Sequence, residues 1–482
     1  MSETLDEIWG GDLLDRRKDA DFLQKFLIAK SEQKKSNPES PSFALNIDQS
    51  WGAGKTFFLK RFKQQLEAEG HISCYINAWE DDFSEDPIIP ILSALDEQLL
   101  PPDGKATKAR KSFAKAARII GKHLMHGIIR KTVAISVSEM TDELGNDDAA
   151  DAITEASEEL AEKSAHDIID RFRENKQHIN EFKEAFACVV SELAENGSKS
   201  PLFILIDELD RCRPTYAIAL LERIKHLFSV EDVVFVLTTN KEQLIHSVGA
   251  IYGQNFDSSR YLNRFFDSTY RFTKPTIERY VPYLLDKESI DIKKLSPPPN
   301  TDIFHFISKC ADAYNLTLRD IEQCIIILSS ITSLWSFKSK IELTYLIPLI
   351  FSDHIGKFDE FNLLSPGGHA EWQYKWQTEY QPAVPEFTFK INTRNRKTRV
   401  SEVRIAKLSD LIDALLSAAP TPLNNLEDIS NQTGIAASWA YQILVREFVD
   451  DHPTLNDSKK LIPSKILKYP DYVRHARLLT IE

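Results

Sequence analysis

A glycine-containing loop between an apolar run and a helical pattern is the segment best suited to chemistry. Residues Phe43–Lys60 read FALNIDQSWGAGKTFFLK, in which Gly52 and Gly54 precede Lys55 and Thr56. Glycines allow successive backbone N–H groups to turn toward one anion, and the start of the next helix adds partial positive charge. The Lys55 ammonium suits the β- and γ-phosphates of a nucleoside triphosphate, and the Thr56 hydroxyl suits Mg²⁺. The sequence therefore predicts a triphosphate site that also binds Mg²⁺.

This predicted phosphate loop departs from the usual pattern GxxxxGK[ST] at its first position. Gln49 stands where that pattern has glycine. If the position requires a positive φ, Gln49 would be strained by about 1 kcal/mol; otherwise the loop turns differently there. The residues expected to contact the nucleotide are Gln49, Ser50, Trp51, Gly52, Ala53, Gly54, Lys55, Thr56 and Phe57.

A second apolar run ends in two acidic residues. Pro201–Arg213 reads PLFILIDELDRCR, so Asp207 and Glu208 follow the predicted strand. We expect Asp207, together with Thr56, to hold the Mg²⁺ shell, and Glu208 to polarise the attacking water during hydrolysis. A buried strand followed by an acidic helix cap is the alternative. It stays open for Asp210, which is placed to cap the next helix.

A third apolar run, Val233–Thr239, ends at Asn240. In nucleotide hydrolases of this layout, a polar residue at that strand end lies between the two motifs and can hold the attacking water. We therefore expect Asn240 to sense the γ-phosphate. A plain N-cap for a helix that begins with Lys241 and Glu242 is the competing interpretation.

Four short apolar runs alternate with helical patterns in the first half of the chain. They are Phe43–Ile47, Ile72–Ile76, Phe203–Ile206 and Val233–Leu237. This alternation predicts an α/β fold in which a parallel sheet is flanked by helices on both faces.

The 482 residues exceed what one hydrophobic core accommodates. We expect a nucleotide-binding core over residues 1–275, a helical, lid-like region over 276–364, and a mostly helical C-terminal accessory domain over 365–482. One hairpin is expected in the last part, between Phe387–Ile391 and Arg399–Ile405.

A charged insertion over residues 101–200 interrupts the core. Lys105–Lys131 contains nine Lys and Arg and no acid, whereas Glu139–Glu162 contains ten acids and no Lys or Arg. Apolar residues at helical spacing within Phe113–Ile128 make the basic half an amphipathic helix. Either the two halves form a helical hairpin with opposite charges facing each other, or the basic half makes peripheral contact with an anionic membrane or an acidic partner.

The composition excludes several classes of protein. Hydrophobic residues make up 42% and charged residues 27% of the chain, which is typical of a globular protein and not of a disordered one. The net charge of -13 argues against nucleic-acid binding over the whole surface. The cysteines form no CxxC pair, so we expect reduced thiols and no zinc site. No apolar stretch is long enough to span a membrane, and we expect a cytoplasmic location.

Several motifs, in order and spacing, resemble the KAP family of P-loop NTPases. They are DLLDRRKDADFLQKFL at Asp12–Leu27, SWGAGKT, YINAWE at Tyr75–Glu80, IDELDRCRP, TTNKEQL at Thr238–Leu244 and YLNRFFD at Tyr261–Asp267. The resemblance implies ATP as the nucleotide, an extra strand between the two motif strands, and the roles given above to the phosphate loop and the acidic pair. The family includes phage-exclusion proteins of bacterial plasmids and membrane-anchored animal scaffolds.

The resemblance also points to two arginines. Arg264, in YLNRFFD, would stabilise charge on the phosphates, in cis or from a neighbouring subunit. Arg319, in NLTLRDIEQ, would be presented to the nucleotide by the helical region. A salt bridge to the acidic surface is the alternative for each. Many family members carry transmembrane helices between the two motifs, where this chain has the charged insertion.

Two C-terminal features raise nucleic acid as a partner. Leu426–Val445 has the apolar spacing of a helix-turn-helix around Gly434, but its second helix, Ala437–Glu447, offers only Arg446 as a base. Two packed helices joined by a tight turn are the alternative. The basic stretch Lys390–Lys407 is the better nucleic-acid candidate, unless it is a solvated hairpin.

Three hypotheses for function follow. The first is a Mg²⁺-dependent ATPase whose nucleotide cycle drives conformational switching or assembly, as a homo-oligomer or with a partner protein, in anti-phage defence or phage exclusion. The second, motivated by Gln49 and by the large non-catalytic portion of the chain, is a nucleotide-binding scaffold with little hydrolysis. The third is an ATP-powered module that acts on nucleic acid.

Overall fold

The computed structural model describes residues 4–35, 41–99, 111–119, 176–195, 197–273, 277–365, 388–394, 401–428, 434–453 and 461–478. The chain divides into two compact units. The first comprises Met1–Ser50 and Gly54–Thr273, and the second comprises Trp51–Ala53 and Lys274–Glu482. The first unit ends two residues before the predicted boundary at 275. The predicted lid-like region and C-terminal domain belong to one unit, so the structure does not separate them near residue 365.

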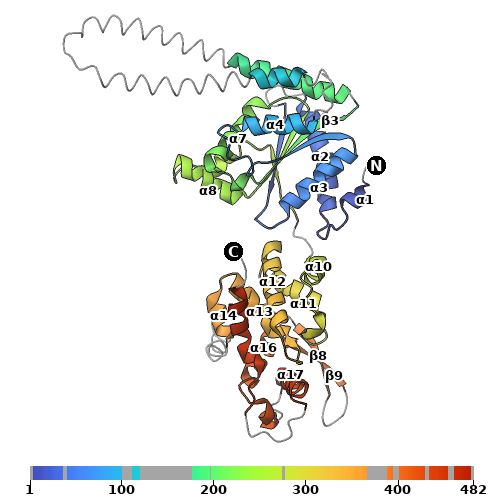
Figure 1. Ribbon diagram of the computed structural model, residues 1–482, viewed down its shortest axis with the longest axis vertical. Helices are drawn as coiled ribbons and strands as arrows, with labels where there is room; N and C mark the ends of the chain where they lie inside the picture. Colours follow the sequence, from blue (N-terminus) through green and yellow to red (C-terminus); the bar gives the residue numbers. More distant parts are fainter. Residues whose placement is uncertain are drawn as a thin grey trace, which may run out of the picture. The chain divides into compact units, whose positions relative to one another are not determined.

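A five-stranded parallel sheet forms the centre of the first unit (Figure 1). Its strands are β1 (Phe43–Asp48), β2 (His71–Asn77), β3 (Lys199–Asp207), β4 (Val233–Thr239) and β5 (Ser268–Tyr270), in the spatial order β2-β3-β4-β1-β5. All neighbouring strands run parallel, and β4 lies between β1 and β3. The predicted α/β fold class is confirmed, and the extra strand separates the two motif strands.

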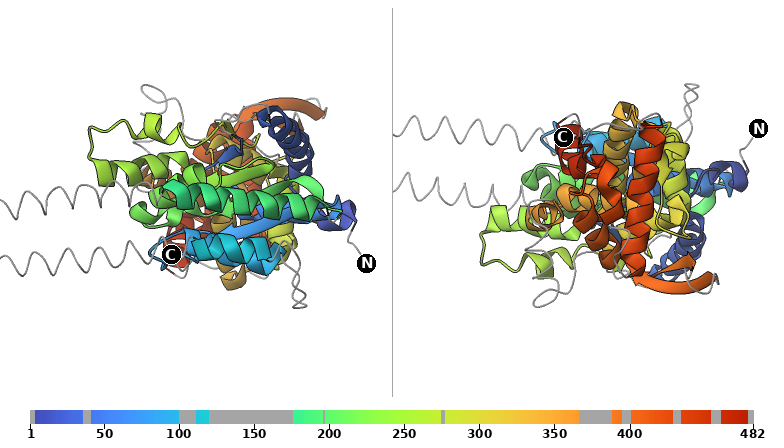
Figure 2. Two further views of the ribbon diagram at one scale, coloured as in Figure 1. Left: turned by 90° about the horizontal axis from the view of Figure 1, so that it is seen from above. Right: turned by 90° about the horizontal axis from the view of Figure 1, so that it is seen from below.

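Helices cover both faces of this sheet (Figures 1 and 2). One face carries α1 (Leu5–Ile8), α2 (Arg16–Lys34) and α3 (Lys55–Ala68). The other carries α4 (Ile88–Leu99), α7 (Pro214–Leu227), α8 (Lys241–Tyr252), α9 (Ser258–Leu262) and helical segments over residues 111–119 and 176–195. A separate hydrophobic cluster fills each layer. Burial on both faces explains why the strands are continuous apolar runs.

The helical segment 111–119 is the described part of the basic amphipathic helix. Its apolar residues Phe113, Ala116 and Ile119 are buried in the cluster beneath α4 and α7. The predicted membrane-facing role is therefore wrong for Phe113, because its ring packs into the protein core. Residues 120–128 and the acidic stretch Glu139–Glu162 lie outside the described residues. Within the described parts of the chain, no helix is long and apolar enough to cross a membrane.

Because this segment packs against the sheet on one side only, substitutions at its buried and exposed alanines should differ in their effect on stability. Ala116→Leu is expected to destabilise the protein by about 1–3 kcal/mol, because a larger side chain in a filled core displaces its neighbours. Ala114→Leu, on the exposed side, is the matched control and should change stability by less than about 0.5 kcal/mol. Thermal unfolding of both variants measures the effect. Equal melting temperatures would contradict the buried placement.

The second unit is mainly helical. Its helices are α10 (Tyr280–Lys287), α11 (Ile303–Ala313), α12 (Leu318–Leu334), α13 (Leu343–His354), α14 (Phe358–Leu364), α16 (Leu408–Ala418), α17 (Ile435–Asp451) and α18 (Tyr469–Arg477). Short 3-10 helices are η2 (Ile277–Arg279), η3 (Ile292–Lys294), η4 (Leu423–Asp428) and η5 (Lys465–Lys468). Strands β6 (Leu295–Ser296) and β7 (Ile341–Glu342) pair in parallel. Helix α18 packs on α12 and α13 and so contributes to the core of this unit.

The predicted hairpin is present, formed by β8 (Thr388–Arg394) and β9 (Ser401–Lys407) in antiparallel register. The helix-turn-helix and its alternative, two packed helices joined by a tight turn, both depend on residues 429–433, which lie outside the described part. The described residues just before them form the 3-10 helix η4. Helix α17 begins at Ile435 and buries Trp439 and Leu444 while it packs on α16. Nucleic-acid binding by Lys390–Lys407 stays a prediction.

Candidate functional site

The phosphate loop joins the carboxyl end of β1 to α3. Gly52 and Gly54 have φ values of 79° and 83°, a left-handed conformation that favours glycine, and they are the loop residues with positive φ. Gln49 is outside that conformation, so the strain considered for it does not arise. Instead, its backbone N–H donates to the Thr239 carbonyl (3.0 Å) and its side-chain amide donates to the Phe272 carbonyl (3.0 Å). Gln49 therefore anchors the start of the loop to β4 and to the segment that follows β5.

The Lys55 side chain lies inside this loop. Its ammonium donates to the Gln49 carbonyl at 2.7 Å and lies 3.9 Å from the Asp210 carboxylate. Burial lowers the pKa of Lys55, and the charges of Asp210 and Asp207 oppose that shift. Asp210 does not cap α7 as considered, because that helix begins after Arg213 and Asp210 belongs to the 3-10 helix η1 (Leu209–Arg211). A buried cation is thus held among carboxylates at the carboxyl edge of the sheet.

Asp207 is fully buried at the end of β3 and accepts hydrogen bonds on both carboxylate oxygens. Its Oδ1 accepts from the Thr238 hydroxyl and from the Glu208 backbone N–H (2.9 Å). Its Oδ2 accepts from the Tyr75 hydroxyl at 3.1 Å. Thr238 comes from β4 and Tyr75 from β2, the strands on either side of β3. The orientation of Asp207 is therefore fixed from both sides.

Glu208 adopts a left-handed backbone conformation, with a φ of 58°. This conformation is uncommon for residues other than glycine, and such strain is concentrated at functional sites. The Glu208 carboxylate lies 3.1 Å from the Arg211 guanidinium, which in turn lies over the Trp79 ring at 5.5 Å from its centre. In the turn directly after β3, the Glu208 carboxylate is therefore held by Arg211.

This geometry fits a bound Mg²⁺–nucleotide complex. Two glycines give the loop its left-handed turns, a buried ammonium lies inside it, and Thr56 occupies the first turn of the helix that follows. The buried Asp207 carboxylate supplies the oxygen ligand chemistry that Mg²⁺ prefers.

The model of the KAP family P-loop domain matches residues 27–335, which is more than half of the chain. The chain belongs to the KAP family of P-loop NTPases. No match is found among curated proteins. The solved structure "Structure of C. elegans PCH-2" aligns over 74% of this chain and 73% of that chain, at 12% sequence identity and a TM-score of 0.28. A likeness that weak carries no argument about this KAP NTPase, which is identified as a nucleotide-binding protein by its family and fold.

Asn240 follows β4, between the strands that carry the phosphate loop and the acidic pair. Its side-chain oxygen accepts from the Glu242 backbone N–H at 3.2 Å, so it caps α8. This hydrogen bond is the one expected if Asn240 of this KAP NTPase is an N-cap. The sensor role stays a prediction, and the position of Asn240 at the end of β4 is compatible with it.

Arg264 lies away from the phosphate loop of its own chain. It precedes β5, and the nearby Asp267 N–H donates to the Ala44 carbonyl (2.8 Å) near the start of β1. The Lys225 ammonium, in the last turn of α7, donates to the Arg264 carbonyl. These contacts place Arg264 at the amino edge of the parallel sheet, whereas the loop lies at the carboxyl edge. The role expected for Arg264 in cis is not supported, and the role from a neighbouring subunit stays a prediction.

Arg319 is exposed at the second residue of α12, in the second unit. The helix start is well defined, because Thr317 and Asp320 form a capping box. Asp320 also pairs with His354 at 3.0 Å, and this contact, with the Thr317 hydrogen bonds, lowers the pKa of Asp320 to about 2. Arg319 is therefore held on a rigid helix end, and its role toward the nucleotide stays a prediction.

Sequence reasoning missed Asp48 and Arg271. The Asp48 carboxylate accepts from the Arg271 guanidinium at 2.6 and 2.9 Å and from the Lys241 backbone N–H at 2.9 Å. These contacts tie the last residue of β1 to α8 and to the segment after β5. The position of Asp48 directly before the phosphate loop could have drawn attention to it. Its partners, Lys241 and Arg271, are 193 and 223 residues away in the chain, so no local pattern indicated the contacts.

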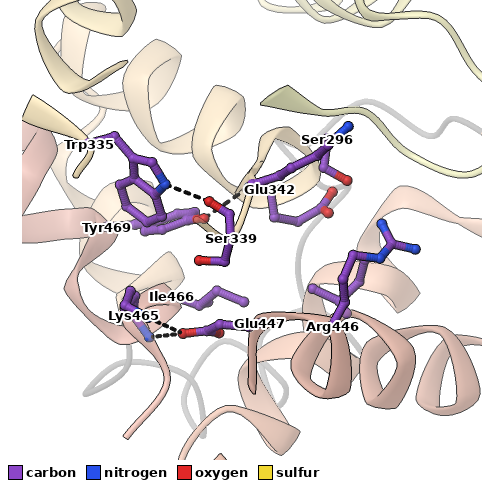
Figure 3. A pocket seen from close by; sticks show the side chains of 11 residues that line it. Ser296, Trp335, Ser339, Glu342, Arg446, Glu447, Lys465, Ile466 and Tyr469 are labelled. Atoms are coloured by element: carbon purple, nitrogen blue, oxygen red, sulfur yellow. Dashed lines mark hydrogen bonds and ion pairs between the residues drawn. The ribbon is translucent and has the colours of Figure 1, made fainter. Parts of the chain in front are cut away.

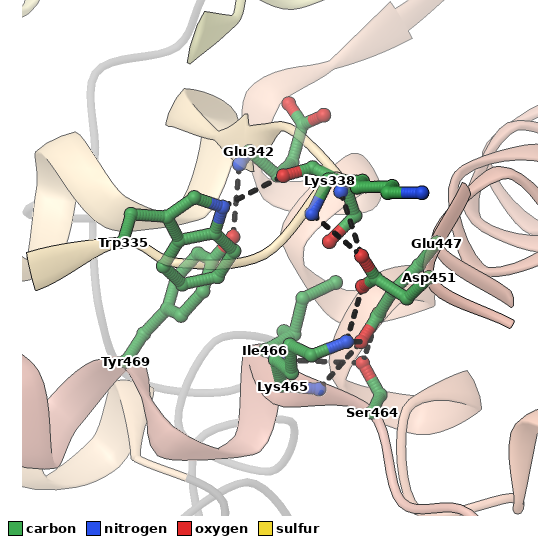
Figure 4. A network of polar contacts seen from close by, with 10 residues as sticks. Trp335, Lys338, Glu342, Glu447, Asp451, Ser464, Lys465, Ile466 and Tyr469 are labelled. Atoms are coloured by element: carbon green, nitrogen blue, oxygen red, sulfur yellow. Dashed lines mark hydrogen bonds and ion pairs between the residues drawn. The ribbon is translucent and has the colours of Figure 1, made fainter. Parts of the chain in front are cut away.

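A polar cavity of about 20 Å³ lies within the second unit (Figure 3). Its lining residues come from β6, the segment between α12 and β7, β7 itself, α17, η5 and the start of α18, and include Ser339, Glu342, Arg446, Lys465 and Tyr469. Space of this size accommodates about one water molecule. Figure 4 shows the adjoining network, in which the Asp451 carboxylate accepts from the backbone N–H groups of Lys338 and Ser339 at 2.8 and 2.9 Å.

Proposed function

We propose that this KAP NTPase hydrolyses ATP with Mg²⁺, and that its nucleotide cycle drives a conformational change or an assembly step. The observation that carries this proposal is the gathering of Lys55, Asp210 and Asp207 at one edge of the sheet, with a left-handed turn at Glu208 directly after Asp207. Such a set combines phosphate binding, metal binding and a carboxylate for general-base work.

Each residue has a separate task in this proposal. The Lys55 ammonium and the loop N–H groups bind phosphate oxygens, and Thr56 and Asp207 hold the metal shell. Glu208 orients the attacking water and accepts its proton at a carboxylate oxygen. When bound, Mg²⁺ neutralises charge on the phosphate oxygens. Arg211 holds the Glu208 carboxylate at 3.1 Å and so sets the direction in which it points.

Nucleotide binding is tested by Lys55→Ala. Removal of the ammonium should weaken ATP affinity about 10- to 100-fold, since one charge-assisted hydrogen bond contributes about 1.5–3 kcal/mol. Lys63→Ala, on the same helix but paired with Glu67 at 2.6 Å, is the matched control and should bind normally. Titration of a fluorescent ATP analogue measures both. Unchanged affinity in Lys55→Ala would defeat the proposal.

The biological role is proposed only from the roles of other members of the family. Phage-exclusion proteins in the same family support a role in anti-phage defence, with ATP-dependent assembly of a homo-oligomer or of a complex with a partner protein in the cytoplasm. The scaffold hypothesis rested on Gln49 and on the large non-catalytic portion of the chain, and the absence of positive φ at Gln49 removes the first of these two grounds. Plaque counts on cells that express wild type or Lys55→Ala would test the defence role, which predicts protection by wild type only.

A further inference from the structure

We propose that Tyr75 is a positioning residue for the metal site: its hydroxyl fixes the plane of the Asp207 carboxylate and so sets the affinity for Mg²⁺. The inference rests on the proposed function, because it assigns Asp207 to the metal shell. It concerns β2, a strand that carries no part of the phosphate loop or of the acidic pair.

The reach of Tyr75 follows from strand register. In the β2–β3 pair, Tyr75 lies opposite Leu205 and Asn77 lies opposite Asp207. Tyr75 and Asp207 thus lie diagonally on one face of the sheet, a separation that an aromatic side chain spans. The hydroxyl donates to Asp207 Oδ2 at 3.1 Å.

The Tyr75 hydroxyl contacts the second carboxylate oxygen of Asp207, Oδ2. Thr238 and the Glu208 backbone N–H both donate to Oδ1, whereas the Tyr75 hydroxyl donates to Oδ2. With donors on both oxygens, the plane of the carboxylate is held at two points. Because Asp207 is fully buried, bulk solvent does not supply a replacement. Tyr75 is therefore the side chain that fixes the carboxylate plane.

The backbone of Tyr75 is itself held in place. The Gln98 side chain of α4 accepts from the Tyr75 backbone N–H (3.0 Å) and donates to its carbonyl (2.7 Å). A preorganised donor of this kind acts on the metal site through its ligand, and such partners typically contribute about 10- to 100-fold to metal affinity.

The test is a Mg²⁺ titration of ATP-analogue binding by the full chain. Tyr75→Phe keeps the ring and removes the hydroxyl. We expect the Mg²⁺ midpoint to rise about tenfold, while affinity for the metal-free nucleotide changes by less than about twofold. Tyr270→Phe is the matched control, because it removes another tyrosine hydroxyl that donates to a carboxylate, Asp19 at 2.6 Å. It should keep the wild-type midpoint.

The outcomes are distinct. An unchanged midpoint in Tyr75→Phe, with wild-type thermal stability, overturns the inference while the proposed function stands. Loss of metal-free binding in the same variant also overturns it, because the effect would then be general damage to the site. Gln98→Ala is the second variant, and by loosening the Tyr75 backbone it should raise the midpoint about threefold. If binding of the ATP analogue by the wild-type protein does not depend on the Mg²⁺ concentration, the proposed function itself is contradicted.

Discussion

Glu208→Gln is expected to lower the rate of phosphate release from ATP by about 100-fold or more, because the amide cannot accept the proton of the attacking water. Nucleotide affinity should change by less than about twofold, since the replacement keeps the size of the side chain. The left-handed backbone at Glu208 is an additional reason to expect a large effect, because a strained residue at a strand end is held there by its surroundings. Steady-state phosphate release, with ATP-analogue binding measured in parallel, separates the two properties.

The matched control for this prediction is Glu222→Gln. Glu222 lies on α7 and accepts from the Tyr261 hydroxyl at 3.1 Å. Glu222→Gln therefore makes the same chemical change in the same unit, at a carboxylate that has a different hydrogen-bond partner. We expect its turnover to stay close to wild type. If Glu208→Gln and Glu222→Gln release phosphate at the same rate, Glu208 is not the general base. Turnover that persists in Glu208→Gln but disappears in Lys55→Ala would move the base to another residue of the site.

Local sequence patterns predicted the parts of the site that a short segment determines. Gly54 and Lys55 are recognisable because loop, lysine and helix start are contiguous, and Asp207 is recognisable because it ends an apolar run. The contribution of Tyr75 was not predictable in the same way. Its hydroxyl meets Asp207 only because β2 pairs with β3, and the two residues are 132 positions apart in the chain. Pairing of distant strands leaves no mark in either local pattern.

Hydrophobic periodicity identified the helix that contains Phe113 but not the surface that covers it. An apolar stripe on a basic helix has the same spacing whether it faces a bilayer or a protein core. The structure decides the question for residues 111–119, where the stripe joins a cluster that includes Phe182 and Phe186. Both partners follow the acidic stretch Glu139–Glu162 in the chain, so no local feature of the sequence near Phe113 pointed to them.

Glu342→Gln is expected to stabilise the protein at alkaline pH. Glu342 is 1% exposed in β7, and burial raises the pKa of its carboxyl to about 7, against opposing contributions from Thr344, Ser296 and Arg446. Its Oε1 accepts from the Thr344 N–H and hydroxyl, whereas Oε2 has no hydrogen-bond partner among the described residues. The charged and titratable groups that line the same cavity are Lys340, Arg446, Glu447, Lys465 and Tyr469.

The sign of the effect follows from which state binds the proton more tightly. The folded pKa of Glu342 lies above the usual value of 4.5, so its contribution to stability is present below about pH 4.5 and is lost as pH rises to about 7. The shift corresponds to a loss of about 3 kcal/mol across that window. Glutamine does not ionise, so Glu342→Gln should exceed wild type by up to about this amount at pH 8. Near pH 5 the two proteins should differ by less than about 1 kcal/mol.

Urea unfolding of the full chain at several pH values between 5 and 8 measures this difference. Titrations elsewhere in the protein cancel when variant and wild type are compared at each pH. Glu322→Gln is the control: Glu322 lies on α12 of the same unit, but its carboxylate pairs with Lys287 at the surface (2.6 Å). That variant should show a small difference that does not change with pH, because an exposed ion pair contributes little. A difference between Glu342→Gln and wild type that is equally independent of pH would mean that Glu342 is already ionised in the folded protein. The buried carboxyl would then have to be stabilised by Arg446 more strongly than its burial opposes ionisation.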